Sequence, residues 1–180
     1  AFDVDGCVDP DHSENYNDLK KELLNYVNLD HQHYSSLAEA MVKADIFIGV
    51  SAPRLVTTEM VASMNQGNIV FAMANPEPEI TYDKVKEAGA YIIGTGRSDY
   101  PNQVNNLLAF PGIFRGALDA KATKITENMK LAAAKGLASL ISDDELSPEN
   151  IIVSAFDERV VPTVAKAVAD EAVASGFVRK

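Results

Sequence analysis

Apolar residues along the chain follow two patterns, short unbroken runs and positions repeating every three or four residues. Unbroken runs at 46–50 and 68–73 predict strands buried on both faces of a sheet, because neither run alternates with polar residues. Shorter runs predict strands at 1–4 and 90–93. Helical spacing predicts helices in the intervening and following segments: 15–27, 35 or 36 to 43, 57 or 58 to 64, 81–88, 107–120, 125–141 and 162–175.

Local signals mark the ends of these helices. Glu39 stands three residues after Ser36, as in a capping box, Gly89 closes one helix, and Pro162 fits the first turn of the last. Strands that alternate with helices favour parallel pairing through right-handed crossovers. The predicted fold class is therefore α/β, a partial doubly wound, Rossmann-like parallel sheet. From Asn105 onward the strand signal ends, and C-terminal helices follow.

Composition narrows the classes of function. With 180 residues, 47% hydrophobic and 23% charged, the chain is an ordinary globular sequence. Its net charge of −10 argues against nucleic acid and anionic membranes as partners. The single cysteine and the lack of a long apolar run favour a soluble, cytoplasmic protein in a reducing compartment. The sequence opens on a strand with no polar lead-in, so we expect a segment upstream of it.

Candidate ligand groups follow the predicted strands, because ligands of open parallel sheets bind beyond the carboxyl ends of the strands. The first strand ends at Asp3, and the next three are followed by 49–53, 74–76 and 94–97. We expect these four loops to meet at one edge of the sheet.

Asp3 has two interpretations. A carboxylate at a strand end, ahead of a turn at Gly6, suits the adenine-ribose hydroxyls of a dinucleotide, but the same residue can simply form an Asx turn. With Asp5 nearby and no basic residue close in sequence, a ribose 2′-phosphate would be poorly received. If the site exists, NAD is therefore preferred to NADP.

The next two loops carry small and amide residues. Gly49, Val50, Ser51 and Ala52 would let a ligand approach the backbone and its free amide donors, although a tight strand-to-helix turn explains them equally well. Asn75 precedes a proline, which displays its carboxamide on an extended turn. An ordinary Asn-Pro turn remains the alternative.

Asn105 and Asn106 open a strongly apolar segment. One asparagine can cap the helix that follows, which leaves the second free to bind a small carboxylate. His12, His31 and His33 lie in polar stretches and do not show the carboxylate and cysteine company of a metal site.

Together these segments resemble a known family. Phe2-Asp3 with Gly6 is followed by IGVSAP, FAMANPEPE, GTGRSDYPNQVNNLLAFPGIFRGALD (94–119) and ENIIVSAFDERVVPTVAKAVA. The chain resembles the malic enzymes over nearly its whole length, most closely the short bacterial NAD-dependent form. The resemblance implies oxidative decarboxylation of L-malate to pyruvate and CO2, with NAD or NADP as acceptor, Mg2+ or Mn2+ as metal cofactor, and a homodimer.

The resemblance also implies roles for single residues. Asp3 is similar to the family's adenine-ribose carboxylate, and Gly49, Val50, Ser51 and Ala52 to the backbone lining the cofactor. Asn75 and Asn106 resemble the amides that bind malate and border the nicotinamide, with Asn105 in support beside the cofactor. Pro111-Gly112 resembles a turn behind that site. Arg54 departs from the family, whose short forms usually carry glycine there.

In this family the catalytic tyrosine and lysine, the metal carboxylates and the glycine-rich loop lie upstream of the position of Asp3. No catalytic or metal residue is therefore assigned here, and the metal would be bound by residues outside this chain. We expect 1–141 to be an NAD(P)-binding domain lacking its first βαβ unit. The tail and helix at 142–180 would pack on the sheet or on an absent N-terminal domain. Alone, the chain would be inactive; the alternative is a non-catalytic NAD-binding module.

Overall fold

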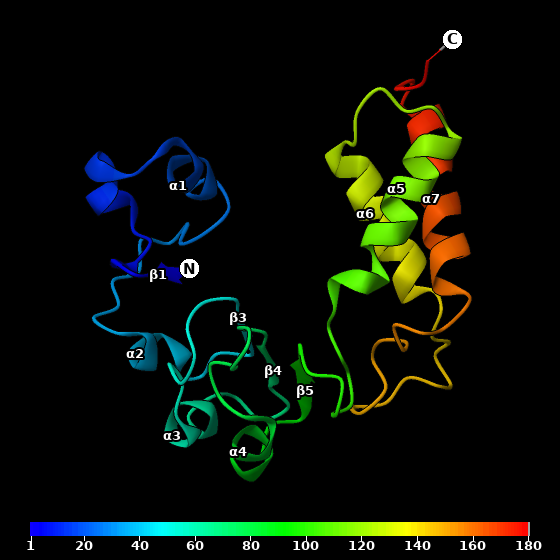
Figure 1. Cartoon of the computed structure of the whole chain (residues 1–180). Coiled ribbons are helices and arrows are strands. Elements are labelled where there is room, and N and C mark those ends of the chain that lie inside the picture. The colour runs from blue at the N-terminus through cyan, green and yellow to red at the C-terminus, as the bar shows by residue number, and fades with distance from the viewer. Residues whose placement is uncertain (180) are drawn as a thin grey trace. The chain divides into compact units, whose positions relative to one another are not determined.

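The computed structural model describes residues 1–179, and the chain divides into two compact units, 1–91 and 92–180. The first unit contains β1 (Phe2–Asp3), β2 (Gly6–Cys7), η1 (Pro10–Asn15), α1 (Asp18–Leu23), α2 (Leu37–Met41), β3 (Ile46–Gly49), α3 (Thr58–Ala62), β4 (Ile69–Ala72) and α4 (Tyr82–Glu87). The second contains β5 (Ile92–Thr95), η2 (Asn106–Leu108), α5 (Phe110–Asp119), α6 (Glu127–Ala138) and α7 (Val160–Ala174). Figure 1 labels most of these elements.

Three of the strands form a sheet of order β3-β4-β5, which confirms the α/β class. β3 and β4 are parallel, with Ile46 opposite Ile69 and Gly49 opposite Ala72. Because the two strands end at the same level, the loops that follow them leave the sheet from the same edge. The structure therefore confirms the expected neighbourhood of these two loops.

The prediction that the strands are buried on both faces is wrong for β3. Phe47 and Gly49 are buried, but Ile46 and Ile48 are 53% and 61% exposed. β3 stands at one end of the strand order, and the described chain covers only one of its faces. An apolar strand can pack against other elements on one face or on both faces, so the sequence pattern alone does not show which of the two applies.

The strand expected at 1–4 exists as β1, but it does not join the parallel sheet. It pairs antiparallel with β2, with Phe2 opposite Cys7 and Asp3 opposite Gly6. Gly6 has a φ of 109°, a conformation that side-chain-bearing residues rarely adopt. A hairpin between segments this close in sequence costs little loop-closure entropy, and here it is preferred to pairing with a distant strand.

Helix caps follow the sequence signals. Ser36 accepts a hydrogen bond from the amide of Glu39 at the start of α2, and Thr57 accepts one from Met60 at the start of α3. Gly89 follows α4 with a φ of 85°. The helix predicted at 15–27 is shorter, since regular α-helix is confined to α1.

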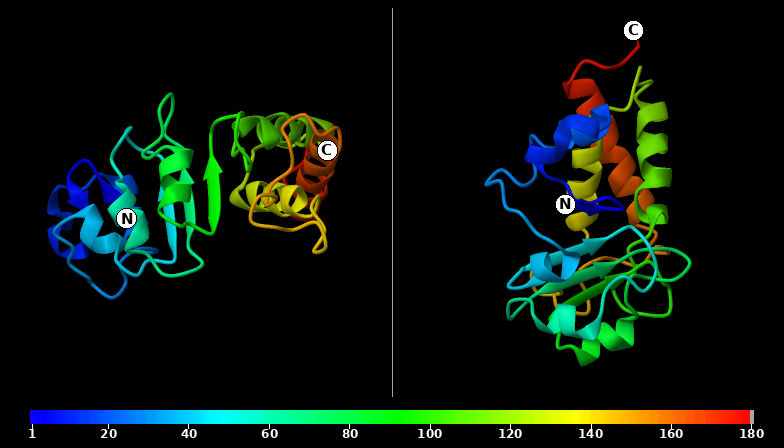
Figure 2. Two further views of the ribbon diagram at one scale, coloured as in Figure 1. Left: turned by 90° about the horizontal axis from the view of Figure 1, so that it is seen from below. Right: turned by 90° about the vertical axis from the view of Figure 1, so that its left-hand side faces the viewer.

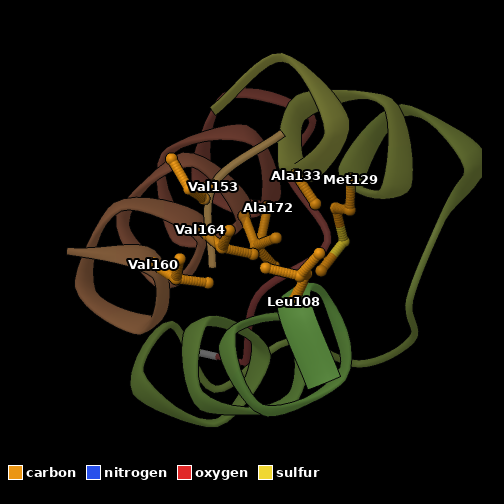
Figure 3. Close-up of a cluster of buried hydrophobic side chains, with 8 residues drawn as sticks. Leu108, Met129, Ala133, Val153, Val160, Val164 and Ala172 are labelled. Carbon is orange, nitrogen blue, oxygen red and sulfur yellow. The ribbon is translucent and has the colours of Figure 1, made fainter. Parts of the chain in front are cut away.

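In the second unit α5, α6 and α7 run side by side (Figures 1 and 2). The core of this unit is apolar, as Figure 3 shows, and partly buried Ile113 and Ala117 of α5 pack against it. Its buried residues are Leu108, Met129, Ala133, Val153, Val160, Val164, Val168 and Ala172. The turn expected at Pro111-Gly112 is wrong, because both residues lie in the first turn of α5. A Cβ on Gly112 would stand 2.6 Å from the Cβ of Val164, so glycine here allows α5 and α7 to pack closely.

Candidate functional site

The loops after β3 and β4 are joined by one buried carboxylate, that of Glu79. One of its oxygens accepts a hydrogen bond of 2.7 Å from the amide of Ser51, and also one from the Ser51 hydroxyl. The other accepts a 3.0 Å hydrogen bond from the amide of Ala74. Glu79 is completely buried. Because both loops donate hydrogen bonds to the Glu79 carboxylate, this side chain fixes the position of one loop relative to the other.

Gly49 makes this carboxylate bridge possible. A Cβ at position 49 would lie 2.5 Å from the carboxyl carbon of Glu79 and less than 3 Å from both of its oxygens. The Gly49 carbonyl accepts a hydrogen bond from Met73, which adds a further link between the two strand ends. The small residue is thus required by Glu79, whereas the sequence suggested approach to a ligand.

The predicted residues of these loops lie at the surface around the bridge. Val50, Ser51, Ala52 and Asn75 are all exposed, and the Asn75-Pro76 peptide bond is cis. Ser51 is not a free amide donor as expected, since its N–H is bound to Glu79. Contact with a cofactor therefore stays a prediction for these four side chains and for the backbone of Gly49.

Arg54 keeps a glycine-like backbone. Its φ of 59° lies in the left-handed region, where a side chain costs about 1 kcal/mol or more. Its amide donates to the carbonyl of Pro78, and its guanidinium pairs with Glu77 at 2.9 Å. These contacts stabilise the left-handed backbone at position 54, where the family that the sequence resembles usually carries glycine.

Asp3 lies at the end of β1, outside the parallel sheet, and its carboxylate has a basic partner. Lys20 of α1 forms an ion pair with it, and the same ammonium lies 2.9 Å from Asp5. The hydrogen bond from Lys20 is the main reason that the pKa of Asp3 is below its ordinary value. No basic residue is close to Asp3 in sequence, but the fold brings Lys20 against it. Asp3 also accepts a 2.9 Å hydrogen bond from the amide of Asp5, which is the Asx-type bond of the alternative interpretation.

In the second unit the two asparagines have different roles. Asn105 caps η2 by accepting a 3.0 Å hydrogen bond from the amide of Leu107. Asn106 is exposed and lines a shallow, apolar pocket of about 360 Å3. The other lining residues are Leu107, Phe110, Pro111 and Phe114. As the sequence suggested, the cap accounts for one asparagine and leaves the second available.

Asn102 holds the loop that leads to this pair, and sequence reasoning missed it. The side chain is buried and donates to the carbonyls of Ile93, at 2.9 Å, and Pro148, at 2.8 Å. It accepts a 2.9 Å hydrogen bond from the amide of Ile151. These partners are distant in sequence, so no local pattern signalled them. Glu79 was also missed, because the Ser51 amide that it binds is 28 positions away in the sequence.

Comparison with known proteins identifies this combination of elements. Residues 2–173 match the family model for the malic enzyme NAD-binding domain. A bifunctional malic/malolactic enzyme of Bacillus subtilis is 52% identical over 98% of this chain and 43% of its own length. An NAD-dependent malic enzyme of Geobacillus stearothermophilus is also 52% identical, over 81% of this chain and 30% of its own length. The chain thus spans less than half of either relative.

A solved structure agrees with the sequence matches. The NAD-dependent malic enzyme of Thermotoga maritima superposes with a TM-score of 0.80 at 42% identity, covering 89% of this chain and 41% of that one. Further relatives bear the name NADP-dependent malic enzyme. Within the described residues, no helix has the length and apolarity needed to cross a membrane. By sequence and by fold, the chain belongs to the malic enzyme family and corresponds to its NAD-binding domain.

Proposed function

We propose that this chain supplies the cofactor-binding portion of an enzyme that oxidatively decarboxylates L-malate to pyruvate and CO2 while reducing NAD(P)+. The family match over residues 2–173 carries the proposal. In it, 1–141 form the Rossmann-like portion, and 142–180 form the tail with the last helix. The active enzyme is a cytoplasmic homodimer, and Mg2+ or Mn2+ is held by residues outside this chain.

The Glu79 bridge fits a cofactor-binding role. Bound NAD(P)+ accepts the hydride that malate loses on oxidation. The backbone of Gly49 and the exposed Val50, Ser51 and Ala52 line the cofactor, on a loop already fixed by the buried carboxylate. A preformed loop loses little conformational entropy when the ligand binds, which favours affinity.

The asparagines orient the substrate beside the cofactor. Asn75 and Asn106 each present a carboxamide, which can donate to a malate carboxylate and accept from the nicotinamide amide. Asn105 supports Asn106 by capping η2 next to it. Orientation of this kind contributes about 7 kcal/mol or more to barrier reduction in well-held reactants, and a 1 Å error costs about 100-fold in rate.

We propose NAD+ as the preferred acceptor. Lys20 places one positive charge between Asp3 and Asp5, so the two carboxylates leave that corner with a net charge of −1. With its ammonium committed to both acids, Lys20 does not compensate a ribose 2′-phosphate, and Asp3 remains an acceptor for ribose hydroxyls. Steady-state kinetics with NAD+ and NADP+ test this preference, and a higher kcat/KM with NADP+ contradicts it.

A chimaera tests the function directly. Residues 1–180 replace the matched segment of the Bacillus subtilis enzyme, and malate-dependent formation of NADH is followed in the presence of Mn2+. We expect turnover with malate, and Asn106→Ala should lower kcat about 100-fold because the substrate is no longer held. Asn128→Ala, at an exposed position of α6, is the matched control and should leave kcat unchanged.

The same assay distinguishes the proposed enzyme from the alternative function. A non-catalytic NAD-binding module would bind NAD+ in the folded chimaera but form no NADH from malate. If Asn106→Ala and Asn128→Ala gave the same kcat, the substrate role of Asn106 would be wrong while the family assignment stood.

A further inference from the structure

All three histidines of the chain gather around two aspartates in the first unit. His33 lies with Nδ1 2.6 Å from Oδ2 of Asp9 and with Nε2 3.4 Å from Oδ2 of Asp11. Nδ1 of His31 is 3.4 Å from the other oxygen of Asp11, and Nδ1 of His12 is 3.5 Å from Asp9. Two carboxylates and three imidazoles therefore meet, although the sequence showed no such company for the histidines.

The backbone holds the two contributing segments in place. Asp9 caps η1 by accepting a 2.9 Å hydrogen bond from the amide of Asp11, and its side chain is only 5% exposed. The turn that carries His31 is held by Asn28, which accepts from the amide of Gln32 and donates to its carbonyl. The donors thus come from two separately ordered segments.

The charge and chemistry of the cluster favour a cation. Within residues 1–179, neither Asp9 nor Asp11 is paired with a lysine or arginine; the side chains beside their carboxylates are the histidines. One ligand atom each from Asp9, Asp11 and His33 lie within 4.8 Å of one another. Carboxylate oxygen with imidazole nitrogen suits Zn2+, whereas Mg2+ and Ca2+ prefer oxygen ligands alone.

We propose that Asp9, Asp11 and His33 bind a divalent transition-metal ion of the Zn2+ class, with His12 or His31 within reach as a further nitrogen ligand. The ion joins η1 to the segment that follows the turn at 28–32. This site is independent of the malate chemistry proposed above and is separate from its Mg2+ or Mn2+. Its role is structural, since binding to the folded form alone stabilises that form.

Zinc titration of the chelator-treated 180-residue chain, without any affinity tag, tests the site. Isothermal calorimetry should show one saturable Zn2+ site that millimolar Mg2+ or Ca2+ does not displace. His33→Gln and Asp11→Asn should each weaken the Zn2+ affinity about 10-fold or more, because each removes one ligand. Both side chains are more than half exposed, so these variants keep the fold. Asp143→Asn, an exposed acid elsewhere, is the matched control and should bind Zn2+ as the original chain does.

A second measurement does not depend on the variants. Imidazole resonances in 1H–15N spectra of the unmodified chain should shift for His33 on addition of one equivalent of Zn2+. Absence of saturable binding below about 100 μM, equal affinity in His33→Gln and the original chain, or displacement by Mg2+ would each overturn the proposal.

Discussion

The two units of the chain each present an exposed asparagine on a loop held by a buried polar side chain, but the holding groups differ. Glu79 supports the loop of Asn75 with a carboxylate that only accepts hydrogen bonds. Asn102 supports the segment that leads to Asn106 with a carboxamide that both donates and accepts. The first arrangement collects free N–H groups at strand ends, whereas the second also satisfies carbonyls from two distant segments.

The difference shows how each loop depends on its support. A buried carboxylate is costly to desolvate and is tolerated only with several donors, so Glu79 and its two loops form an all-or-nothing unit. A buried amide carries no charge and costs less to desolvate, and its loss strands one N–H group rather than two. We therefore expect the Glu79 bridge to be the more sensitive of the two.

Removal of the carboxylate should have the largest effect. Glu79→Leu removes the acceptor of the partly buried amides of Ser51 and Ala74, at about 1–3 kcal/mol each, so we expect a loss of about 4 kcal/mol in the free energy of unfolding. Urea unfolding followed by circular dichroism measures it. Glu77→Leu is the control, because this exposed residue pairs with Arg54 at the surface and its loss should change stability by less than about 1 kcal/mol. If both variants lost the same free energy of unfolding, the stabilising role of the Glu79 carboxylate would be wrong.

Removal of the amide should come next. Asn102→Ala strands the N–H of Ile151 and leaves two carbonyls short of a donor, so we expect a loss of about 2–3 kcal/mol by the same urea measurement. Asn25→Ala, at an exposed position where the side chain bonds only within its own turn, should cost much less. A loss larger than that of Glu79→Leu would reverse the comparison.

Gly49→Ala sharpens the comparison from the backbone side. The new methyl group would meet the Glu79 carboxyl at 2.5 Å, and that side chain is fixed by its hydrogen bonds, so we expect a loss of about 2 kcal/mol. At Gly136 in α6 the nearest atom to a new Cβ is 3.2 Å away, and alanine favours helix by about 1 kcal/mol. The small shift that Ala167 must make offsets part of this gain, so Gly136→Ala should lower the melting temperature much less than Gly49→Ala does. Similar melting temperatures for the two variants would contradict this account.

The smallest expected effect is the pH dependence of stability at the ion pair of Asp157 and Arg159 in the second unit. This pair does not hold either of the asparagine loops in place. Arg159 lowers the pKa of Asp157 from 3.8 to about 2, through side-chain and backbone hydrogen bonds. Because the folded-state pKa is the lower one, the stabilisation is present above pH 3.8 and is lost as the pH falls to about 2. The urea midpoint of Asp157→Asn should thus be below that of the original chain at pH 6 and equal to it near pH 2. A constant difference at both pH values would exclude the linkage.

Much of the local structure was predictable from sequence. The cap at Ser36, the beginning of α3, the C-terminal Gly89 and the positions of β3, β4 and the last three helices all follow from short-range sequence patterns. The Asn105 cap belongs to the same class, since its partner is two residues away. Most errors concern groups whose partners are distant: the Lys20 pairing of Asp3, the packing of Gly112 on α7 and the surroundings of the histidines. The hairpin of β1 with β2 is the exception, because its partner is only a few residues away.

The sequence by itself determined the element types, the α/β class and the family, because periodicity, caps and motifs are encoded within a few neighbouring residues. Only the tertiary structure decided that Glu79 joins two loops, that Asn102 secures a third, and that three histidines share two aspartates. The physical reason is the separation in sequence between the residues that interact. A hydrogen bond between residues 28 or 49 positions apart depends on how the whole chain folds back on itself, and no local pattern carries that information.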